Sequence, residues 1–403
     1  MSNHASEHAR HWRLDPEIVF LNHGSFGACP AAVLDEQTRI RDELEREPLT
    51  FLDRELRDRL AVAREALAEF IGADSDDVAF VTNATSGVNA VLRSLKFEPG
   101  DELLLSNHEY NACRNALYYV AERWGAKPVV FDIPFPLAGE DDVIEAALGK
   151  VTPRTRLLLI DHITSPTALV LPVKRLVDEM QVRGIDTLVD GAHAPGMLPL
   201  NLKELGAAYY TGNCHKWLCT PKGSAFLHVR PDRKRLIKPT VISHGYNMLV
   251  PEEMRYRVEF DWTGTADPSP WLCIPKAIEF LSSLYPDGMA GHIRRNRELA
   301  IAARKYLMQR FEIPAPAPES MLGSMASLPM PDNILGSPEG MPWKDWMFEA
   351  LYHRFKIEVI VTPWPAAPER KLRICAQAYN SMRQYEVLAD ARSEERRVGK
   401  ECR

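Results

Sequence analysis

The sequence lacks the features that would point to a membrane, to nucleic acid or to secretion. No apolar run approaches the roughly 20 residues that a membrane-spanning helix needs. The net charge of -6 offers no basic footprint for nucleic acid. The N-terminal stretch MSNHASEHARHWRLDPE has no apolar core of the kind a secretory signal requires. We therefore predict no membrane or nucleic-acid partner, and a cytoplasmic location.

Cysteine is scarce and shows no pairing pattern. The seven cysteines are scattered and odd in number. Cys214 and Cys219 do not form a CxxC pair, and no second pair completes a zinc site. These features are typical of reduced thiols in a cytoplasm. The sequence therefore predicts neither a disulfide framework nor a metal site.

The remaining composition is that of a soluble globular protein with more than one domain. Apolar residues make up 45% and charged residues 26% of 403 positions, which suggests two or more domains. Strand-like runs alternate with helical patterns from residue 77 to 229, which favours a mostly parallel sheet with helical crossovers. A fully apolar run at 156–163 has the length of a strand covered on both faces.

These patterns divide the chain into four parts. We expect a loose polar segment over 1–19, a large domain over 20–275, a smaller α+β domain over 276–392, and an appended or disordered tail over 393–403. The tail is predicted because its charge run, SEERRVGKECR, breaks the preceding apolar stripe.

The stretch from Leu188 to Gly223 carries the most specific chemistry. Asp190 ends an apolar run, and Lys216 lies beside Trp217. Burial disfavours the charge of a lysine and makes it a nucleophilic amine near neutral pH. Most lysines are solvated and most strand-end aspartates are turn formers, so neither residue alone would be specific. Together, an amine that can form a Schiff base and an acid that can hold a ring-nitrogen proton are typical of pyridoxal 5'-phosphate (PLP) chemistry.

The wording between these two residues, DGAHAPG followed by YYTGNCHKWL, resembles the class V aminotransferases, and within them the isopenicillin N epimerase-like branch. The resemblance covers roughly residues 20–380. It implies the aspartate aminotransferase-like fold type I, with a mostly parallel seven-stranded sheet in the large α/β domain. It also implies PLP on Lys216, its ring nitrogen at Asp190, its phenolic oxygen near His193, and further contacts from Asn213 and His215, the latter near the phosphate.

Two further segments match the family's cofactor site. TNATSG, containing Thr85 and Ser86, follows a strand and opens a helix, where free N–H groups and the helix dipole favour an anion. Simple N-capping by either hydroxyl is the commoner explanation of such a pattern. The resemblance places the cofactor phosphate here. It also implies that His108 stacks on the ring, with Tyr110 as a second aromatic candidate and Thr167 as another contact.

Three further segments are candidates for contacts with the substrate or with a second subunit. In LNHGSFG, two glycines indicate a tight turn close to a ligand or to another backbone, and Asn22 and His23 are candidate substrate contacts. Arg373 lies in the apolar run RICAQAYN, where a buried cation needs an anion; a structural salt bridge would satisfy it as well. The resemblance implies that it binds the substrate carboxylate. It also implies that Gly264 and Thr265 reach the neighbour's phosphate in a homodimer, with residues 20–30 near the small domain.

Several outcomes remain open after the α-proton is removed from an amino-acid substrate. Reprotonation gives an epimerase, loss of a β-sulfur group gives a C–S lyase of the cysteine or ergothioneine-type sulfoxide class, and a third outcome is transamination. A persulfide-forming desulfurase needs a cysteine before the carboxylate arginine, but the loop VTPWPAAP, with Trp364, has none, and Cys375 lies beyond Arg373. A non-catalytic PLP-fold protein is the remaining alternative, against which Asp190, Lys216 and Arg373 argue.

Overall fold

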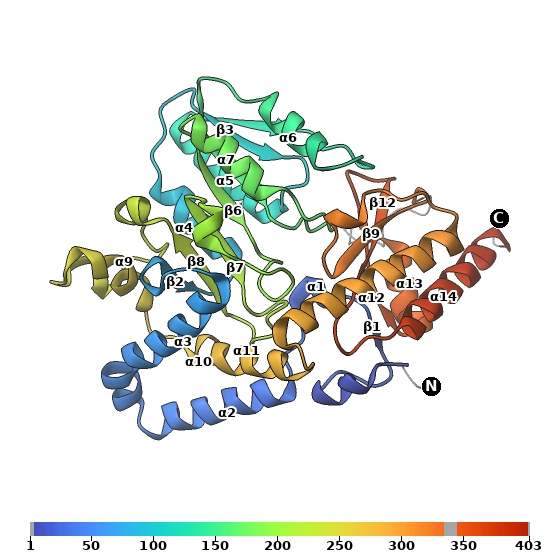
Figure 1. Ribbon diagram of the computed structural model, residues 1–403, viewed down its shortest axis with the longest axis horizontal. Helices are drawn as coiled ribbons and strands as arrows, with labels where there is room; N and C mark the ends of the chain where they lie inside the picture. Colours follow the sequence, from blue (N-terminus) through green and yellow to red (C-terminus); the bar gives the residue numbers. More distant parts are fainter. Residues whose placement is uncertain (1–3, 334–344, 402–403) are drawn as a thin grey trace.

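A sheet of seven strands forms the centre of the larger lobe in the computed structural model (Figure 1). The structure describes residues 4–333 and 345–401, of which residues 393–401 are described by their backbone alone. In spatial order the strands are β2 (Val78–Val81), β8 (Ala225–Val229), β7 (Tyr209–Asn213), β6 (Asp186–Asp190), β5 (Thr155–Asp161), β3 (Glu102–Ser106) and β4 (Lys127–Phe131). Only β8 runs antiparallel to its neighbours, so the predicted mostly parallel seven-stranded sheet is confirmed.

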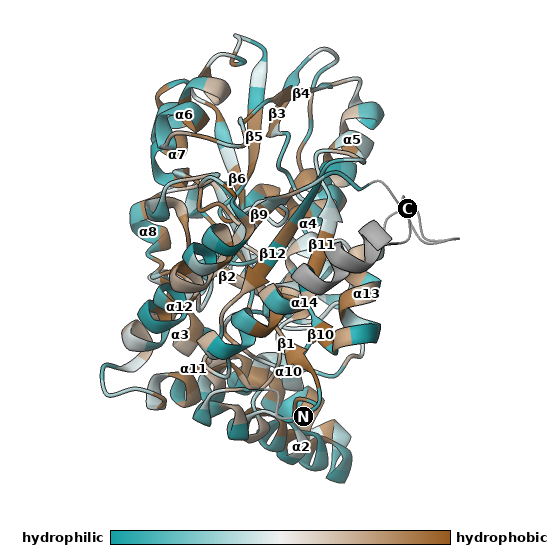
Figure 2. Cartoon of the chain, turned by 90° about the vertical axis from the view of Figure 1, so that its right-hand side faces the viewer, coloured by the Kyte–Doolittle hydropathy of each residue, from teal (hydrophilic) through white to brown (hydrophobic). Residues whose placement is uncertain are grey.

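Both faces of this sheet are covered by helices. Alternate residues of one strand enter different cores: Leu103 and Leu105 pack with one cluster, and Leu104 with the other. One face is covered by α4 (Ala84–Ser94), α5 (Asn111–Trp124) and α9 (Glu252–Asp261). The other is covered by α2 (Ala31–Arg46), α3 (Leu56–Ile71), α6 (Glu140–Leu148), α7 (Val173–Val182) and α11 (Ile274–Ser283). This double cover explains the continuous apolar strand runs, visible as brown strands beneath partly teal helices in Figure 2.

The smaller lobe has a separate core. Its antiparallel sheet has the order β11 (Ile360–Pro363), β12 (Arg370–Cys375) and β9 (Met325–Met330). Its helices are α12 (Gly288–Phe311), α13 (Trp346–Phe355) and α14 (Met382–Glu401). Strand β1 (Val19–Phe20) pairs in parallel with β10 (Ile357–Glu358), so the chain joins the small lobe before it builds the large one.

The segment expected to be loose, residues 1–19, is packed wherever it is described. A short 3-10 helix, Glu7–His11, leads to Trp12, which is buried with its ring edge against Phe280 and Tyr379. Ser6 donates through its hydroxyl to the carbonyl of Ala378 at 2.5 Å. The polar sequence did not indicate this packing, because local polarity does not reveal that Trp12 has distant apolar partners.

Two predicted boundaries differ from the observed elements. The boundary between residues 275 and 276 falls inside α11, whose buried side chains belong to the core of the large lobe. At the C-terminal end, the backbone of α14 continues through Ser393 to Glu401, so the break in sequence character there does not end the helix.

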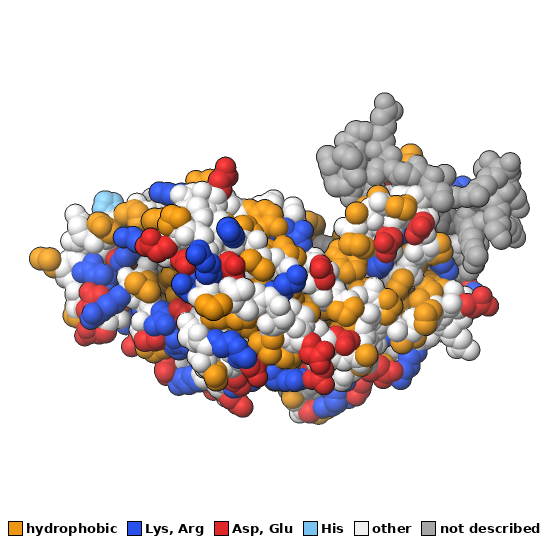
Figure 3. Space-filling model, turned by 90° about the horizontal axis from the view of Figure 1, so that it is seen from above, with side chains coloured by type: hydrophobic (Ala, Val, Ile, Leu, Met, Phe, Trp, Pro, Cys, Tyr) orange, Lys and Arg blue, Asp and Glu red, His pale blue; other side chains and the backbone are white. Residues whose placement is uncertain are grey.

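Charged side chains of both signs are spread over the surface. Basic and acidic side chains are interspersed over the face shown in Figure 3, rather than gathered into a patch of one sign. Among the described residues, no helix is long and apolar enough to cross a bilayer.

Candidate functional site

The predicted cofactor residues meet at one edge of the large sheet. Strands β2, β3, β5, β6 and β7 all run in the same direction, so their carboxyl ends lie together. Asp190 is the last residue of β6, and Lys216 lies in the loop after β7. Ligands of open α/β sheets bind outside this edge. The topology therefore brings together residues from five segments that are distant in the sequence.

Lys216 is an enclosed amine. Its Nζ lies 3.3 Å from Nε2 of His193, and the indole N–H of Trp217 donates to Nδ1 of the same ring at 3.3 Å. Burial, reinforced by the nearby Arg373 cation, lowers the pKa of Lys216 to about 8. Burial also holds the pKa of His193 well below its ordinary value, so that ring is neutral. The predicted nucleophilic amine therefore has the environment that it requires.

Asp190 is a buried carboxyl beside two others. It accepts hydrogen bonds from the thiol of Cys113 at 3.0 Å and from the backbone N–H of Ala192 at 2.9 Å. Burial raises the pKa values of Asp190, Asp161 and Glu109, and in the latter two the neighbouring acids raise it well above the ordinary range. Sequence reasoning missed Glu109 and Asp161, since a strand-end acid and a loop acid carry no motif.

At the start of α4, where an anion site is predicted, some polar groups bond within the chain and others stay open to a ligand. Asn83 caps the helix by accepting from the N–H of Ser86 at 2.8 Å, and Asn213 accepts from the N–H of Ala84 at 2.8 Å. Asn213 therefore anchors this helix to β7. The hydroxyl of Ser86 is also bound internally, to Asn83 at 3.0 Å. Within the described chain, the amide and hydroxyl of Thr85 have no hydrogen bond, so they are the donors open to an anion.

His215 lies in the lysine loop, whereas Gly264 and Thr265 lie on an exposed segment. Nδ1 of His215 lies 2.8 Å from the carbonyl of Ser224, which fixes the ring in the loop that also carries Lys216. Gly264 and Thr265 are exposed on the segment between α9 and α10 (Ser269–Leu272), and no contact described for this chain joins them to Lys216. The exposure of Gly264 and Thr265 is what a contact with another subunit would require.

Arg373 lies on β12 of the small lobe and reaches across to the large lobe. It donates to the carbonyl of Ser165 at 2.7 Å and its hydroxyl at 3.1 Å, and to Ser25 at 3.2 Å. All of these partners are uncharged. In the described chain Arg373 forms no ion pair, and its Nε is buried without a hydrogen bond. The structural salt bridge considered as an alternative is therefore not observed, and the cation is left for a ligand.

The N-terminal motif LNHGSFG packs directly on the lysine loop. A side chain at Gly27, whose φ is 72°, would collide with the backbone of His215 and Lys216. Nε2 of His23 lies 2.9 Å from the carbonyl of Lys216, and Nδ1 lies 2.8 Å from the hydroxyl of Tyr379. The expected close backbone approach is confirmed. His23, however, is fully buried with both ring nitrogens engaged, so it positions the lysine loop instead of facing a substrate.

Asn22 is placed beside Arg373, as expected for a residue of the substrate site. Its Oδ1 accepts from Ser25 at 2.7 Å and lies 3.5 Å from the Arg373 guanidinium. Its amide donates to Glu358 of the small lobe at 3.0 Å. Asn22 therefore links the N-terminal segment to both the cation and β10.

The predicted stacking role of His108 does not fit its position. The ring is fully buried, with Nδ1 at 2.7 Å from the hydroxyl of Thr167 and Nε2 at 3.0 Å from the carbonyl of Ile133. Thr167 is likewise buried behind it. Tyr110, two residues later, lines the cavity and is 44% exposed. The aromatic face available to a ring is thus that of Tyr110. The two candidates could not be separated by sequence, because the loop after β3 contains both.

A cavity of about 350 Å³ opens between the two lobes at this site. Glu109, Tyr110 and Arg114 line one side, and Trp364 and Arg373 of the small lobe line the other. Lys216 is not part of this wall, but Arg373 is, and the Arg373 cation helps to lower the pKa of Lys216. The cavity therefore gives a ligand access to Arg373.

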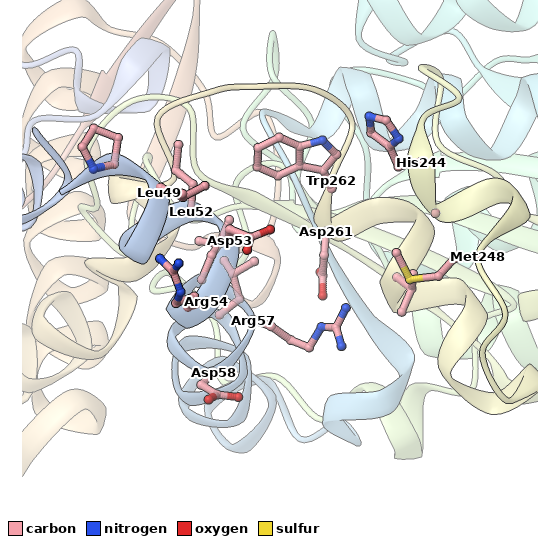
Figure 4. Close-up of a pocket in the computed structure, with 15 residues that line it drawn as sticks. Leu49, Leu52, Asp53, Arg54, Arg57, Asp58, His244, Met248, Asp261 and Trp262 are labelled. Carbon is pink, nitrogen blue, oxygen red and sulfur yellow. The ribbon is translucent and has the colours of Figure 1, made fainter.

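A second, larger cavity of about 970 Å³ lies elsewhere on the large lobe (Figure 4). It is lined by Arg57 of α3, by His244 and Met248 around the 3-10 helix His244–Asn247, and by Asp261 and Trp262. None of the predicted site residues lines it. Strongly exposed apolar side chains are found in the same segments: Leu49, Tyr246 and Leu249. This region has the apolar character of an interface rather than the catalytic groups of an active site.

The residues at the sheet edge fit PLP. The buried amine of Lys216 can bind its aldehyde carbon, and the Asp190 carboxyl can hold a proton at its ring nitrogen. The open donors of Thr85 at the start of an eleven-residue helix can bind its phosphate. The ring of Tyr110 is available for stacking.

Comparison with known proteins supports the same reading. The family model for aminotransferase class V matches residues 36–332. The isopenicillin N epimerase of Streptomyces clavuligerus is 37% identical over 94% of this chain and 95% of its own length. A putative L-cysteine desulfhydrase of Oryza sativa subsp. japonica is 33% identical over 93% and 82%. Among solved structures, a C-DES mutant with glycine covalently linked to its PLP cofactor shares 20% identity and a TM-score of 0.80, over 96% of this chain and 98% of that one.

Proposed function

The chain belongs to the aminotransferase class V family and its cofactor is PLP, and from this premise we propose that it acts at the α-carbon of an amino acid. The observation that supports this proposal is the neighbouring pair Lys216 and Arg373. One is an amine whose pKa is lowered to about 8, and the other is a buried cation without an acidic partner in the described chain. A base and a carboxylate-binding group are what removal of an α-proton requires.

Each residue has a role that follows from its surroundings. Arg373 binds the substrate carboxylate with parallel hydrogen bonds and thereby aims the Cα–H bond. Lys216 removes the α-proton, since a pKa lowered to about 8 leaves part of its amine uncharged near neutral pH. Asp190 would hold a proton on the ring nitrogen of bound PLP, and Thr85 and His215 would bind its phosphate. When bound, PLP supplies an electron sink for the pair of electrons released at Cα.

The finer proposal is an epimerase. It is supported by the 37% identity to the isopenicillin N epimerase over nearly the full length of both chains. Epimerisation needs a proton returned to the opposite face of Cα. Of the residues on the cavity wall, Glu109 and Tyr110 are the titratable groups other than arginine, and either can supply that proton.

The second candidate is a C–S lyase, in which the β-sulfur leaves with the electron pair of the C–S bond. It is supported by the 33% identity to the L-cysteine desulfhydrase. The loop between β11 and β12 contains no cysteine, and Cys375 is buried with the N–H of Gly24 donating to its sulfur at 3.2 Å. A persulfide-forming mechanism on this loop is therefore not part of the proposal.

A homodimer with shared sites completes the proposal. Gly264 and Thr265 are exposed, and no described hydrogen bond joins them to the chain's own cofactor residues. The exposed apolar side chains Leu49, Tyr246 and Leu249, near the large cavity, give a surface that a second copy can cover. We propose that each copy's Gly264 and Thr265 bind the phosphate of the other.

The deciding experiment is a product screen of the PLP-loaded enzyme with amino acids in deuterated water. An epimerase gives both enantiomers with deuterium at Cα and no pyruvate. A C–S lyase gives sulfide, pyruvate and ammonia from cysteine. Absence of α-deuterium exchange and of any product, across the amino acids tested, would refute action at Cα.

A further inference from the structure

Arg114 is a second guanidinium on the wall of the cavity that contains Arg373. It lies in the first turn of α5, and the one described hydrogen bond of its side chain goes to the carbonyl of Asn107 at 2.9 Å. Its Nε is buried without a partner, as is the Nε of Arg373. Neither arginine makes an ion pair with a described acidic residue. A guanidinium carries five N–H donors, so most of those of Arg114 are unused.

The charge of Arg114 is not compensated by the acid on the same wall. Glu109 is buried, and neither of its carboxyl oxygens has a hydrogen bond. Burial and the neighbouring Asp161 and Asp190 raise the pKa of Glu109 well above its ordinary value, and the opposing effect of Arg114 is the smallest of these, so this carboxyl is uncharged. The N-terminal end of α5, which also lines the cavity, adds a further partial positive charge. The wall therefore presents two cations and no anion.

We propose that the cavity selects an amino acid that carries a second anionic group. The α-carboxylate binds Arg373, and the distal carboxylate, or an acid of similar geometry, binds Arg114. The inference rests on the proposed role of Arg373 and adds the chemical class of the substrate. A cavity of about 350 Å³ is within the ordinary size range for a small ligand.

A purely structural role for Arg114 would use its contact with Asn107 alone. That contact employs one N–H and leaves the buried Nε unpaired, which costs free energy unless a ligand accepts from it. Apolar and aromatic side chains, Ile360 and Trp364, form part of the remaining wall and can cover the carbon chain between the two acids.

The test measures binding as well as turnover. Straight-chain dicarboxylates of increasing length, and monocarboxylates of matched length, are titrated into the PLP-loaded protein by calorimetry. We expect one dicarboxylate length to bind at least about tenfold more tightly than its monocarboxylate, because a charge-assisted pair is added. Arg114→Met should abolish this preference, and Arg114→Lys should restore part of it. Arg123→Met, on the exposed side of the same helix, is the control and should retain the preference.

The outcomes separate this inference from the proposed function. If wild-type protein turns over amino acids but shows no preference for a second acid, the substrate class is wrong and the activity stands. If Arg114→Met weakens mono- and dicarboxylates equally, Arg114 is structural. Circular dichroism and bound PLP are measured for each variant. If both Arg114→Met and Arg114→Lys fail to fold, the residue is required for the fold and the inference is also overturned.

Discussion

Nζ of Lys216 lies 3.3 Å from Nε2 of His193, and this contact fixes which partner carries the proton. The indole of Trp217 donates to Nδ1 of His193, so that nitrogen is an acceptor. Because burial keeps the ring neutral, its single proton must be on Nε2. That N–H then donates to the amine, which can accept only when it is uncharged. Trp217 thus acts through His193 to favour the nucleophilic form of Lys216.

The first prediction concerns the pH dependence of cofactor attachment. The pKa of Lys216 is lowered to about 8 from 10.5. The rate at which apoprotein takes up PLP should therefore rise about tenfold per pH unit below pH 8 and level off above it. Stopped-flow absorbance of bound PLP measures this rate. A profile that still climbs at pH 10 would contradict the buried-amine environment.

The same lowered pKa has a consequence for stability. Between pH 8 and 10.5 the unfolded chain binds more protons at this lysine than the folded apoprotein does. The contribution of this lysine to the stability of the apoprotein therefore rises with pH across that window.

Borohydride reduction of the PLP-loaded protein should place the pyridoxyl label on Lys216, with the exposed Lys222 as the internal control.

The second prediction is that Asp190→Asn retains PLP but loses about a hundredfold or more in kcat, because a fixed charge aimed at the reacting system is removed. The matched control is Asp161→Asn, one strand away and in register with Asp190. Since burial and Asp190 hold Asp161 in its uncharged form, the amide should replace it with little loss. Equal losses in the two variants would show that the effect is structural.

The third prediction separates Tyr110 from His108. Tyr110→Ala should weaken PLP binding about two- to tenfold through lost stacking, while Tyr110→Phe should keep it. His108→Asn should instead lower the free energy of unfolding by about 1–3 kcal/mol, because its contacts with Thr167 and Ile133 are buried. Fluorescence titration and thermal unfolding measure the two effects. A larger loss of PLP affinity in the His108 variant would restore the original assignment.

Much of the fold could be predicted because its signals are local. The apolar run at 156–163 contains most of β5, and the apolar run that ends at Asp190 is β6. Strand β7 was not singled out, because Tyr209–Asn213 is a run of aromatic, small and polar residues whose strand character depends on its buried neighbours. Helix α2 was also missed, since its charged face leaves few apolar positions: Val33 and Ile40 are its buried aliphatic residues.

Only part of the candidate site could be predicted from the sequence. Lys216, Asp190 and Arg373 stand in motifs, and the structure places them around one sheet edge and the adjoining small lobe. His23 and His108 were assigned by their position in motifs, but burial and hydrogen bonding decide which way each ring faces. Glu109 and Arg114 have no motif and become visible only as unpaired groups on a common wall.

The fourth prediction tests shared active sites by mixing two inactive variants. Lys216→Ala removes a chain's own site, and Thr265→Asp places a like charge near the partner's phosphate. In a hybrid dimer, the chain with intact Lys216 receives intact Thr265 from its partner, so one site is restored. Co-refolding equal amounts should recover about a quarter of wild-type activity if chains pair at random. No recovery, despite hybrid formation seen by native mass spectrometry, would place the pair in its own chain's site or in neither.

The last prediction concerns Arg373, which lies between the lobes and whose hydrogen bonds to described residues go to uncharged oxygens of Ser165, Ser25 and Asn22. If it binds the α-carboxylate, Arg373→Ala should lose about ten- to a hundredfold in substrate affinity, from a charge-assisted pair of about 1.5–3 kcal/mol. The loss in kcat/KM should be larger, because the Cα–H bond is no longer aimed. Arg373→Lys should rescue only part, as a point charge without the planar fork.

The comparison that isolates this role is an amino acid against the amine that lacks its carboxylate. Wild-type enzyme should strongly prefer the amino acid, and Arg373→Ala should reduce that preference by the full amount of the lost contact. PLP affinity should change little, because Arg373 has no described contact with Lys216, Asp190 or Thr85. If both ligands lose affinity in the same ratio, or if PLP affinity falls as far as activity does, Arg373 joins the lobes together and the carboxylate is bound by another group.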